Sequence, residues 1–410
     1  MRRLLILGAG TAGTIAANKL RRMLDADDWQ ITIVDQRGTH YYQPAFLFIP
    51  FGRYRPDKAR RKASRLIPSG VTRVEGEIDR VDPDARRVAL ADGTVLPYDY
   101  LIIATGTSPH PEETPGMEGD WHGAVHSFYT FDDAVALRGA LAGFTGGRLV
   151  VHISEMPIKC PVAPLEFTLL ADAHLRERDI RDKVDITFVT PLSGAFTKPV
   201  ASAAFGGMLD ERGIAVEPDF MVESIDAEAH RLVSYDEREV PYDLLVTVPV
   251  NKGAAFVGRS GLGDELDFVP VDPHTLRHAA HPEIFAVGDA AAVPTSKAGA
   301  VAHFELDVFP ENFVRIVAGE EPVESFDGHA TCFIESGAGK AMLIDFNYDT
   351  EPLPGMFPVP ALGPLPLLKE SRFNHWGKLA FEPLYWSMLL PGRPLPLPAH
   401  MSMRGKRVPS

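Results

Sequence analysis

The chain of 410 residues is 45% hydrophobic and 23% charged, which is enough to bury cores in two or three domains and too ordinary a mixture for disorder. Its formal net charge of −14 argues against nucleic acid as the main partner, because phosphate binding needs a basic face. The two cysteines, Cys160 and Cys332, lie 172 positions apart, which excludes a disulfide framework and a CxxC metal site. They are either inert thiols or neighbours in the fold.

The start of the chain bears on its location. Met1 runs almost directly into the apolar residues 4–7, which leaves no room for a secretory signal. No window of the sequence approaches the ~18 uninterrupted apolar residues of a spanning helix. We therefore expect a cytoplasmic location.

A nucleotide-binding pattern opens the chain. Residues 4–7 read as a buried strand that stops at the glycine-rich segment 8–13, after which apolar residues continue with helical spacing. A second apolar strand, 31–34, ends in Asp35. The order strand, tight turn, helix, strand and acid is the complete dinucleotide fingerprint in its required context.

Each residue of this fingerprint has a physical role. Gly8 permits the turn, Gly10 lets the backbone approach a pyrophosphate, and Gly13 lets helix and strand pack closely. Asp35 can accept hydrogen bonds from a ribose. The alternative is an accidental glycine-rich turn, which the placement of strand, helix and acid disfavours.

Two later segments resemble each other and indicate a diverged internal duplication. Residues 87–106 and 231–250 both read as strand, turn, strand, then Pro-Tyr-Asp and a buried strand. The second copy has its own opening, with strands at 148–153 and 184–190 and a crossover helix around 163–175. We expect a second doubly wound unit inserted into the first.

The turn that opens the second unit differs from the first. Residues 154–160 contain no GxGxxG, so side chains and a proline stand where a pyrophosphate would need bare backbone. A nicotinamide dinucleotide is not expected there. The first unit is completed late, by a strand that ends at Gly288-Asp289 and leads into a helix, which places Asp289 at the ligand-binding edge of a sheet. The alternative for Asp289 is an ordinary helix N-cap.

The C-terminal segment 353–410 differs in character from the rest of the chain. It contains eleven of the 35 prolines, and its seven basic and two acidic residues give a net charge of +5, which leaves −19 for the preceding 352 residues. Basic residues mixed with aromatic and aliphatic ones, without a span-length run, are typical of an interfacial segment on an anionic bilayer. A domain-capping helix or a dimer interface is the alternative.

The most promising chemistry lies around Cys160. We expect this thiol at the start of a helix, where the helix N-terminus and Lys159 would stabilise a thiolate, and Glu166 could shuttle a proton in the same cavity. Cys332 lies in a strand-like stretch at the start of the tail region. The alternative for each cysteine is a buried, inert thiol.

Together these motifs resemble the sulfide:quinone oxidoreductases of the two-dinucleotide-binding-domain flavoprotein superfamily, over nearly the whole chain. The matching pieces are Gly8–Gly13, Tyr42–Pro44, Ala104–Gly106, Cys160–Glu166, Gly288–Asp289, Lys297–Gly299, Thr331–Phe333 and Lys378–Phe381. The resemblance implies an α/β fold with two Rossmann-like doubly wound domains, the second inserted in the first, plus a C-terminal membrane-interacting region. The implied limits are 1–110 and 265–327 for an FAD-binding domain, 111–264 for the second domain and 328–410 for the C-terminal region.

The resemblance also implies an enzyme that oxidises hydrosulfide to polysulfide or sulfur and passes the electrons through FAD to a membrane quinone. It implies a peripheral membrane protein and leaves a homo-oligomer open. The residues implied to bind FAD are Gly8, Gly10, Gly13, Asp35, Pro44, Ile78, Thr105, Gly106, Gly288, Asp289 and Lys297.

Roles at the reaction centre follow from the same resemblance. Cys332 is implied to be the sulfur beside the flavin, and Cys160 the partner that carries and releases the polysulfide after hydrosulfide attacks a sulfur bridge between them. Phe333 and Phe381 are implied to line the quinone pocket. Lys297 and Lys378 are implied to lie near flavin or quinone oxygens, where a fixed cation stabilises the negative charge that reduction builds.

The chain departs from the family pattern at two places. Tyr129 stands where many members carry a third cysteine, which argues against a mechanism with three cysteines and against a covalent flavin link there. The segment 190–198 lacks the histidine of some members and offers only Lys198, so Glu166 becomes the main candidate for proton transfer.

Three other functions share part of this pattern. The flavoprotein subunit of flavocytochrome c sulfide dehydrogenase has similar cysteines but would require export. A type II NADH:quinone oxidoreductase would need a glycine fingerprint within 154–159. A non-catalytic flavin-binding sensor or scaffold would need neither cysteine.

Overall fold

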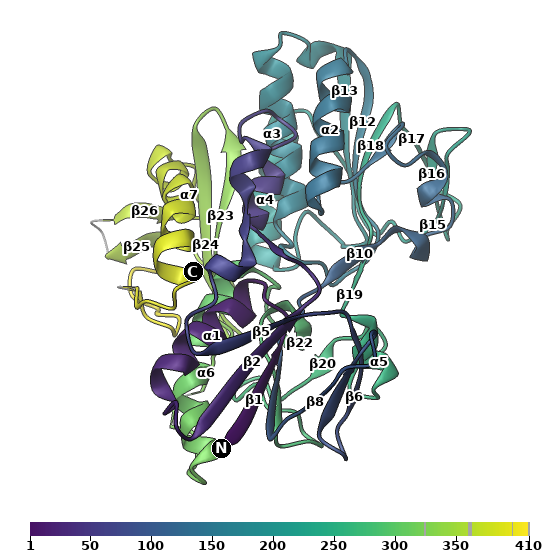
Figure 1. The fold of residues 1–410 in the computed structure, drawn as a ribbon. Helices are drawn as coiled ribbons and strands as arrows, with labels where there is room; N and C mark the ends of the chain where they lie inside the picture. The colour runs from purple at the N-terminus through teal and green to yellow at the C-terminus, as the bar shows by residue number, and fades with distance from the viewer. Residues whose placement is uncertain (324, 360–362, 396, 409–410) are drawn as a thin grey trace.

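Two five-stranded parallel sheets organise the chain (Figure 1), which the computed structural model describes except for residues 324, 360–362, 396 and 409–410. The first has the order β21-β9-β1-β2-β5, with β1 Arg2–Leu7, β2 Trp29–Asp35, β5 Val71–Glu75, β9 Tyr100–Ile103 and β21 Ile284–Ala286. The second has the order β11-β18-β12-β13-β14, with β11 Val125–His126, β12 Gly147–Ile153, β13 Val184–Val189, β14 Ala215–Glu217 and β18 Leu244–Val248. Because β21 follows the second sheet in sequence yet pairs with β9, the second domain is inserted in the first, as predicted.

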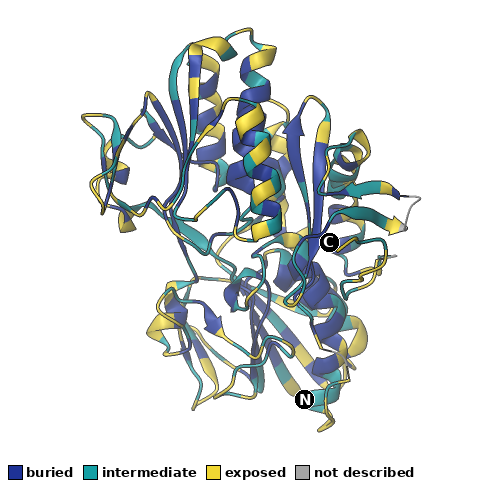
Figure 2. Cartoon of the chain, turned by 180° about the vertical axis from the view of Figure 1, so that it is seen from behind, coloured by how far each residue is buried: buried dark blue, intermediate teal, exposed yellow. Residues whose placement is uncertain are grey.

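Helices cover both sheets. In the first domain α1 (Thr11–Met23) follows β1 and packs against α6 (Gly299–Val317). In the second domain the helices are α2 (Phe131–Gly143), α3 (Ala163–Glu177) and α4 (Pro199–Glu211). The central strands are buried on both faces (Figure 2), which explains why they read as continuous apolar runs rather than as alternating patterns.

The predicted duplication is present in the fold. The antiparallel sheet of β6 (Ile78–Asp82), β7 (Arg87–Leu90) and β8 (Val95–Pro97) is repeated by β15 (Val222–Asp226), β16 (Arg231–Ser234) and β17 (Glu239–Pro241). In each copy a Pro-Tyr-Asp sequence leads into a central strand of a parallel sheet, and its tyrosine, Tyr98 or Tyr242, is 0% exposed. The tyrosine is buried at the same position in both copies, which explains why this tripeptide occurs twice.

Short elements complete the two domains. β10 (Ser108–His110) and β19 (Val250–Lys252) pair antiparallel where the chain crosses between the domains. The others are β3 (Thr39–Tyr41), η1 (Gln43–Leu47), η2 (Pro56–Ala59), β4 (Arg60–Lys62), η3 (Ala63–Arg65), η4 (Pro111–Glu113), η5 (Met117–Asp120), η6 (Arg181–Lys183), α5 (Ala255–Arg259), β20 (Val269–Pro270) and β22 (Ala291–Ala292).

The structure corrects the prediction for the segment after β21. Only a short 3-10 helix, η7 (Gly288–Ala290), follows this strand, and the long helix α6 begins later, at Gly299. Gly288 has φ +66, a conformation that favours glycine and turns the chain away from a helical path. Asp289 therefore lies inside a tight turn at the sheet edge and does not cap a long helix.

The C-terminal region forms a layer against both domains. β23 (Ala330–Gly337) pairs antiparallel with β24 (Lys340–Phe346), and β25 (Gly355–Val359) pairs with β26 (Gly363–Leu367). Helix α7 (Arg372–Leu384) packs on β23 and β24 and continues into a π-helical turn, η8 (Tyr385–Leu389). Within the described part of the chain, no helix combines the length and apolar character needed to cross a membrane.

Candidate active site

The glycine turn after β1 forms a bare backbone surface. A Cβ on Gly8, which has φ +99, would lie 2.5 Å from the carbonyl oxygen of Ala104, and one on Gly13 would lie 1.9 Å from the carbonyl oxygen of Gly8. A Cβ on Gly10 would meet nothing within 4 Å. Gly8 and Gly13 are therefore required by the fold itself, whereas Gly10 faces open space where a phosphate would have to approach.

Polar groups with spare hydrogen-bonding capacity surround this turn. Asp35, at the end of β2, accepts hydrogen bonds from the backbone N–H of Ala9 (2.7 Å) and Arg37 (2.6 Å), and keeps further lone pairs. The Thr105 hydroxyl is buried without a partner among the described residues, and no described group donates to the Asp289 carboxylate, whose pKa is raised by burial. Buried polar groups need partners. The phosphates and hydroxyls of FAD are groups that this edge of the sheet can satisfy.

The remaining residues expected at FAD lie around the same edge. Pro44 is in η1, Gly106 follows Thr105 with φ +69, and Ile78 begins β6, three residues after β5 ends. Gly288 donates its N–H to the buried Glu305 Oε2 at 2.5 Å, which fixes the turn that carries Asp289.

Lys297 differs from its expected role in one respect. Its Nζ donates to the backbone carbonyls of Asp289 (3.0 Å) and Ala291 (2.9 Å) and lies 3.8 Å from the centre of the Phe268 ring. The ammonium therefore supports the Asp289 turn. The Lys297 carbonyl accepts a hydrogen bond of 2.5 Å from the Cys160 N–H, which ties the turn to the cysteine loop.

Cys160 and Cys332 come from different parts of the fold and share the same charged neighbours. Cys160 lies in the loop between β12 and α3 with φ +48, and Cys332 lies on β23, which packs along α3. Both thiols are free, and both lie close enough to Glu166 and Lys378 for these charges to affect their pKa. Cys332 also contributes to the pKa shift of Cys160. The two distant cysteines are thus brought to one site.

The expectation of a thiolate stabilised at Cys160 is wrong for this arrangement. Helix α3 begins at Ala163, and the Lys159 ammonium points to Gln43, with 3.0 Å between Nζ and Oε1. Burial raises the pKa of Cys160, and nearby Glu166 and Cys332 raise it further. Burial also raises the pKa of Cys332, to about 12. Both groups therefore favour the neutral thiol at physiological pH.

Glu166 and Lys378 form a buried ion pair beside the cysteines. The Lys378 Nζ donates to Glu166 Oε1 at 2.8 Å and to the Phe333 carbonyl at 2.8 Å. Glu166 Oε1 also accepts the Glu335 N–H at 2.7 Å, whereas Oε2 is buried and has no partner among the described groups. Burial raises the pKa of Glu166 and the Lys378 ammonium opposes that shift. An unpartnered carboxyl oxygen with a raised pKa suits a group that accepts and returns a proton.

A second buried carboxylate, which the sequence reading missed, continues this network. Glu335 on β23 is 1% exposed and accepts a hydrogen bond from His375 Nδ1 on α7 at 2.8 Å. Burial raises the pKa of Glu335, and His375 opposes that shift. The sequence did contain a signal for Glu335, because it is an acidic residue within an apolar strand. A carboxylate buried in such a strand requires a partner.

Tyr129, the residue expected to replace a third cysteine, lies next to the Cys160 loop. Its side chain is buried, and its hydroxyl donates to the Cys160 carbonyl at 3.3 Å. The tyrosine therefore supports the backbone of the Cys160 loop.

Of the two expected quinone contacts, Phe333 lies under α7 and Phe381 belongs to α7. A Cβ on Gly377 would come within 2.6 Å of Phe333 Cζ, so the glycine allows α7 to lie directly on this ring. Phe381 contacts an aromatic cluster, with ring centres 6.4 Å from Tyr42 and 6.2 Å from Tyr385. Lys378 lies between the two phenylalanines in sequence, and its ammonium is bound by Glu166.

The chain is similar in sequence to known oxidoreductases. Residues 2–152 match the family model described as pyridine nucleotide-disulphide oxidoreductase. The mitochondrial sulfide:quinone oxidoreductase of Mus musculus is 27% identical over 396 residues, covering 95% of this chain and 86% of that protein. The sulfide-quinone reductase of Aquifex aeolicus is 26% identical over 308 residues, covering 70% of this chain and 68% of that protein.

The fold has a close counterpart among solved structures. The X-ray structure of the Aquifex aeolicus sulfide:quinone oxidoreductase superimposes with a TM-score of 0.80 at 22% identity, covering 96% of this chain and 92% of that chain. The predicted α/β fold with two Rossmann-like domains is therefore confirmed. The chain is an FAD-dependent oxidoreductase related over nearly its whole length to the sulfide:quinone oxidoreductases, as its motifs predicted.

Proposed function

We propose that this chain oxidises hydrosulfide to polysulfide or sulfur and delivers the electrons to a membrane quinone. The observation that supports this function best is the meeting of Cys160 and Cys332 at the Glu166–Lys378 ion pair. A purely structural role would require neither two distant thiols at one site nor a carboxyl oxygen beside them without a partner.

The sulfur chemistry follows from these groups. Hydrosulfide attacks one sulfur of a bridge between the cysteines, so that a new S–S bond forms to Cys160 while the bond toward Cys332 breaks. Oxidation of one hydrosulfide to bound sulfur releases one proton and two electrons. Because the bridged cysteines carry no thiol, the external hydrosulfide is the nucleophile, and Cys332 leaves as a thiolate that holds the electron pair passed on to the acceptor. Glu166 takes up the proton through its free Oε2.

FAD, when bound, supplies an acceptor for two electrons that can then be passed to quinone. The residues proposed to hold it are the glycine turn, Asp35, Pro44, Ile78, Thr105, Gly106, Gly288 and Asp289, with Lys297 holding the Asp289 turn in place. These residues fall in the proposed FAD-binding domain, 1–110 and 265–327. The second domain, 111–264, supplies Cys160 and Glu166, and the C-terminal region, 328–410, supplies Cys332.

The exposed face of α7 supports a peripheral location on a membrane. Phe373, Trp376 and Leu379 are 54%, 59% and 54% exposed, which is unusual for large apolar side chains grouped on one helix. Phe333 and Phe381, on and beneath the same helix, are proposed to line the quinone pocket, and Lys378 to stabilise negative charge on the reduced quinone. The cytoplasmic side is the expected face.

Anaerobic mixing of the oxidised protein with sulfide or with NADH tests this function. We expect sulfide to bleach the flavin absorbance. We expect NADH to leave this absorbance unchanged, because residues 154–160 lack the glycine turn that a second dinucleotide needs. Bleaching by NADH and not by sulfide would instead favour a type II NADH:quinone oxidoreductase. Sulfide bleaching without subsequent reoxidation by quinone would favour the subunit of a flavocytochrome c.

A further inference from the structure

Part of the positive charge of the C-terminal tail is neutralised by ion pairs inside the protein. Lys378 pairs with Glu166, and the side chain of Lys406 is 1% exposed and pairs with Asp345, which is also 1% exposed. These two ammonium groups cannot contact a lipid headgroup. A contact between this region and an anionic surface can draw on the five basic residues of the tail that remain exposed, and on cations of neighbouring segments.

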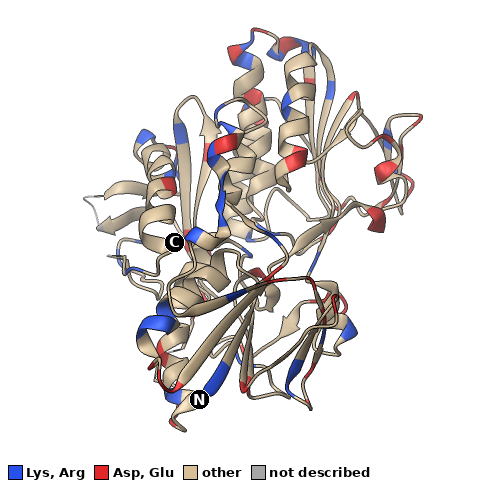
Figure 3. Ribbon diagram, in the orientation of Figure 1, with Lys and Arg blue, Asp and Glu red and all other residues tan. Residues whose placement is uncertain are grey.

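The segment 53–65 supplies further cations beside the C-terminal helix. It contains seven basic residues and one acidic residue, Asp57, in a chain whose net charge is −14. All seven basic residues are exposed: Arg53, Arg55, Lys58, Arg60, Arg61, Lys62 and Arg65. We name this segment the basic strap; Lys and Arg along it can be followed in Figure 3.

Most of the strap's charge is not neutralised by the protein. Arg53 pairs with Glu177 and Arg55 with Asp57. Among the described residues, no carboxylate lies within ion-pair distance of Lys58, Lys62 or Arg65. The strap therefore keeps a dense positive charge that faces solvent.

The strap lies directly against the end of the C-terminal helix. The Tyr54 hydroxyl donates to Glu382 Oε1 on α7 at 2.6 Å, and the Arg61 guanidinium lies 4.0 Å from the centre of the Trp386 ring on η8. The strap's positive charge is thus continuous with the element that exposes Phe373, Trp376 and Leu379.

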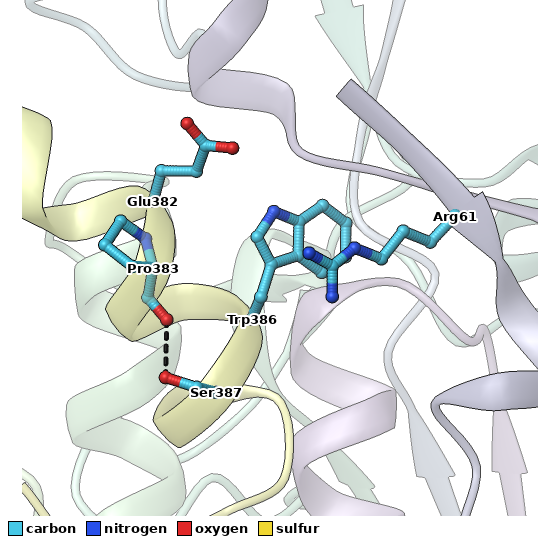
Figure 4. A pocket seen from close by; sticks show the side chains of 5 residues that line it. All are labelled: Arg61, Glu382, Pro383, Trp386 and Ser387. Atoms are coloured by element: carbon cyan, nitrogen blue, oxygen red, sulfur yellow. Dashed lines mark hydrogen bonds between the residues drawn. The ribbon is translucent and has the colours of Figure 1, made fainter. Parts of the chain in front are cut away.

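A pocket opens at this junction. It has a volume of about 510 Å³ and is lined by Arg61, Glu382, Pro383, Trp386 and Ser387. Figure 4 shows the Arg61 guanidinium over the Trp386 ring, with the other three residues projecting from the helical segment. Trp386 is 7% exposed, and its Nε1–H has no partner among the described residues. The Arg61 guanidinium pairs with no carboxylate among the described residues and offers charged donors to an anionic oxygen group. The Glu382 carboxylate in the lining accepts the Tyr54 hydroxyl, and the Trp386 Nε1 is shielded from solvent.

We propose that the basic strap and the Arg61–Trp386 pocket bind the phosphate headgroups of anionic phospholipids, and so set the lipid preference and orientation of the enzyme on the membrane. The proposal rests on the membrane-bound function proposed above. Charge complementarity selects an anionic partner, and the adjoining apolar face of α7 selects a lipid surface over an acidic protein.

Vesicle co-sedimentation of the full-length, flavin-loaded protein tests the proposal. The vesicles are phosphatidylcholine alone or phosphatidylcholine with 30% phosphatidylglycerol. The test variant carries Lys58→Glu, Lys62→Glu and Arg65→Glu, which break no ion pair. The matched control carries Arg80→Glu, Lys183→Glu and Lys340→Glu, the same change in charge at exposed sites on β6, η6 and β24 that also break no ion pair among the described residues.

We expect the unmodified and control proteins to bind anionic vesicles at least tenfold more tightly than neutral ones, and the test variant to lose on the order of a hundredfold in affinity for anionic vesicles. Raising the salt concentration should weaken binding of the unmodified protein, since exposed charges are screened. Arg61→Ala, a second variant, should reduce the preference for phosphatidylglycerol.

Three results would overturn the proposal: equal binding of the test variant and the unmodified protein, equal loss in the control variant, or displacement from vesicles by inorganic phosphate at constant ionic strength. The first would assign the strap to another partner, such as an acidic protein. The third would indicate a site for free phosphate. Sulfide bleaching of the unmodified protein, followed without vesicles, reports on the proposed function separately, so the two hypotheses fail independently.

Discussion

Lys378 on the last long helix and Glu166 on the crossover helix of the second domain form a buried ion pair, with 2.8 Å between Nζ and Oε1. The pair links two parts of the chain that are 212 positions apart and lies beside both cysteines. Removing either partner would leave a buried charge uncompensated. The C-terminal region therefore contributes a charged residue to the proposed active site.

Replacing either cysteine should abolish sulfide oxidation while the fold survives. Cys160→Ser and Cys332→Ser each remove one sulfur of the proposed bridge, so we expect sulfide-dependent quinone reduction to fall by at least about a hundredfold. Retained flavin absorbance and an unchanged melting temperature would serve as the control for folding. Turnover at the unmodified rate in either variant would contradict the proposed mechanism.

The Glu166–Lys378 pair should control the pH dependence of flavin reduction by sulfide. Glu166→Gln removes the proton acceptor and should slow the reaction by about a hundredfold near neutral pH. Lys378→Met removes the ammonium that lowers the Glu166 pKa, so this pKa should rise and the acidic limb of the pH–rate profile should move to higher pH. Lys369→Met, an exposed lysine nearby, is the matched control and should leave the limb in place. If the acidic limb of the pH–rate profile does not move in Lys378→Met, then a group other than Glu166 causes this limb.

Two glycine variants should separate folding from flavin binding. Gly13→Ala places a Cβ 1.9 Å from the Gly8 carbonyl oxygen, so both stability and flavin content should fall. Gly10→Ala meets no protein atom within 4 Å, and the protein without flavin should melt like the unmodified chain while flavin affinity drops at least about tenfold. The ratio of flavin to protein absorbance, together with thermal melting, measures both effects. Full flavin content in Gly10→Ala would place the pyrophosphate elsewhere.

Lys406 should stabilise the fold through Asp345 in a pH-dependent way. Burial alone would raise the Asp345 pKa, but the hydrogen bond and charge of His329 and the charge of Lys406 outweigh it and hold this pKa below its usual value. Lys406→Met should cost about 3 kcal/mol of unfolding free energy at pH 7. Because a depressed carboxyl pKa stabilises only above the unfolded value, the difference from the unmodified protein should shrink as the pH falls below about 4.

Urea denaturation at several pH values measures this effect, with Arg404→Met as the control. Arg404 is an exposed cation close to Lys406 in sequence, with no carboxylate partner among the described residues. A loss of stability in Lys406→Met that is equal at pH 7 and pH 3 would show that packing, rather than the charge on Asp345, is responsible.

Membrane binding should depend on the exposed face of α7. Changing Phe373, Trp376 and Leu379 to serine should release the protein from native membranes, because these side chains do not contribute to the core. Sulfide bleaching in solution should persist in this variant. Deleting residues 369–410 is not a clean test, since it removes Lys378 and Lys406 and leaves Glu166 and Asp345 buried without these partners. Undiminished membrane retention of the triple variant would refute the assignment of this face.

The sequence alone determined the two doubly wound units, their nesting and the glycine turn. These features depend on local pattern: buried parallel strands require apolar runs, and a tight turn near phosphate requires glycine at fixed spacing. Only the tertiary structure decided the protonation state of the cysteines and the partners of the charged side chains. The sequence predicted a stabilised thiolate at Cys160 and a tail whose basic residues face a membrane, whereas the fold buries both thiols and pairs Lys378 and Lys406 with internal carboxylates. A charge acts through the groups that packing brings within a few ångströms of it and through the water that packing removes, and neither is encoded in the spacing of residues along the chain.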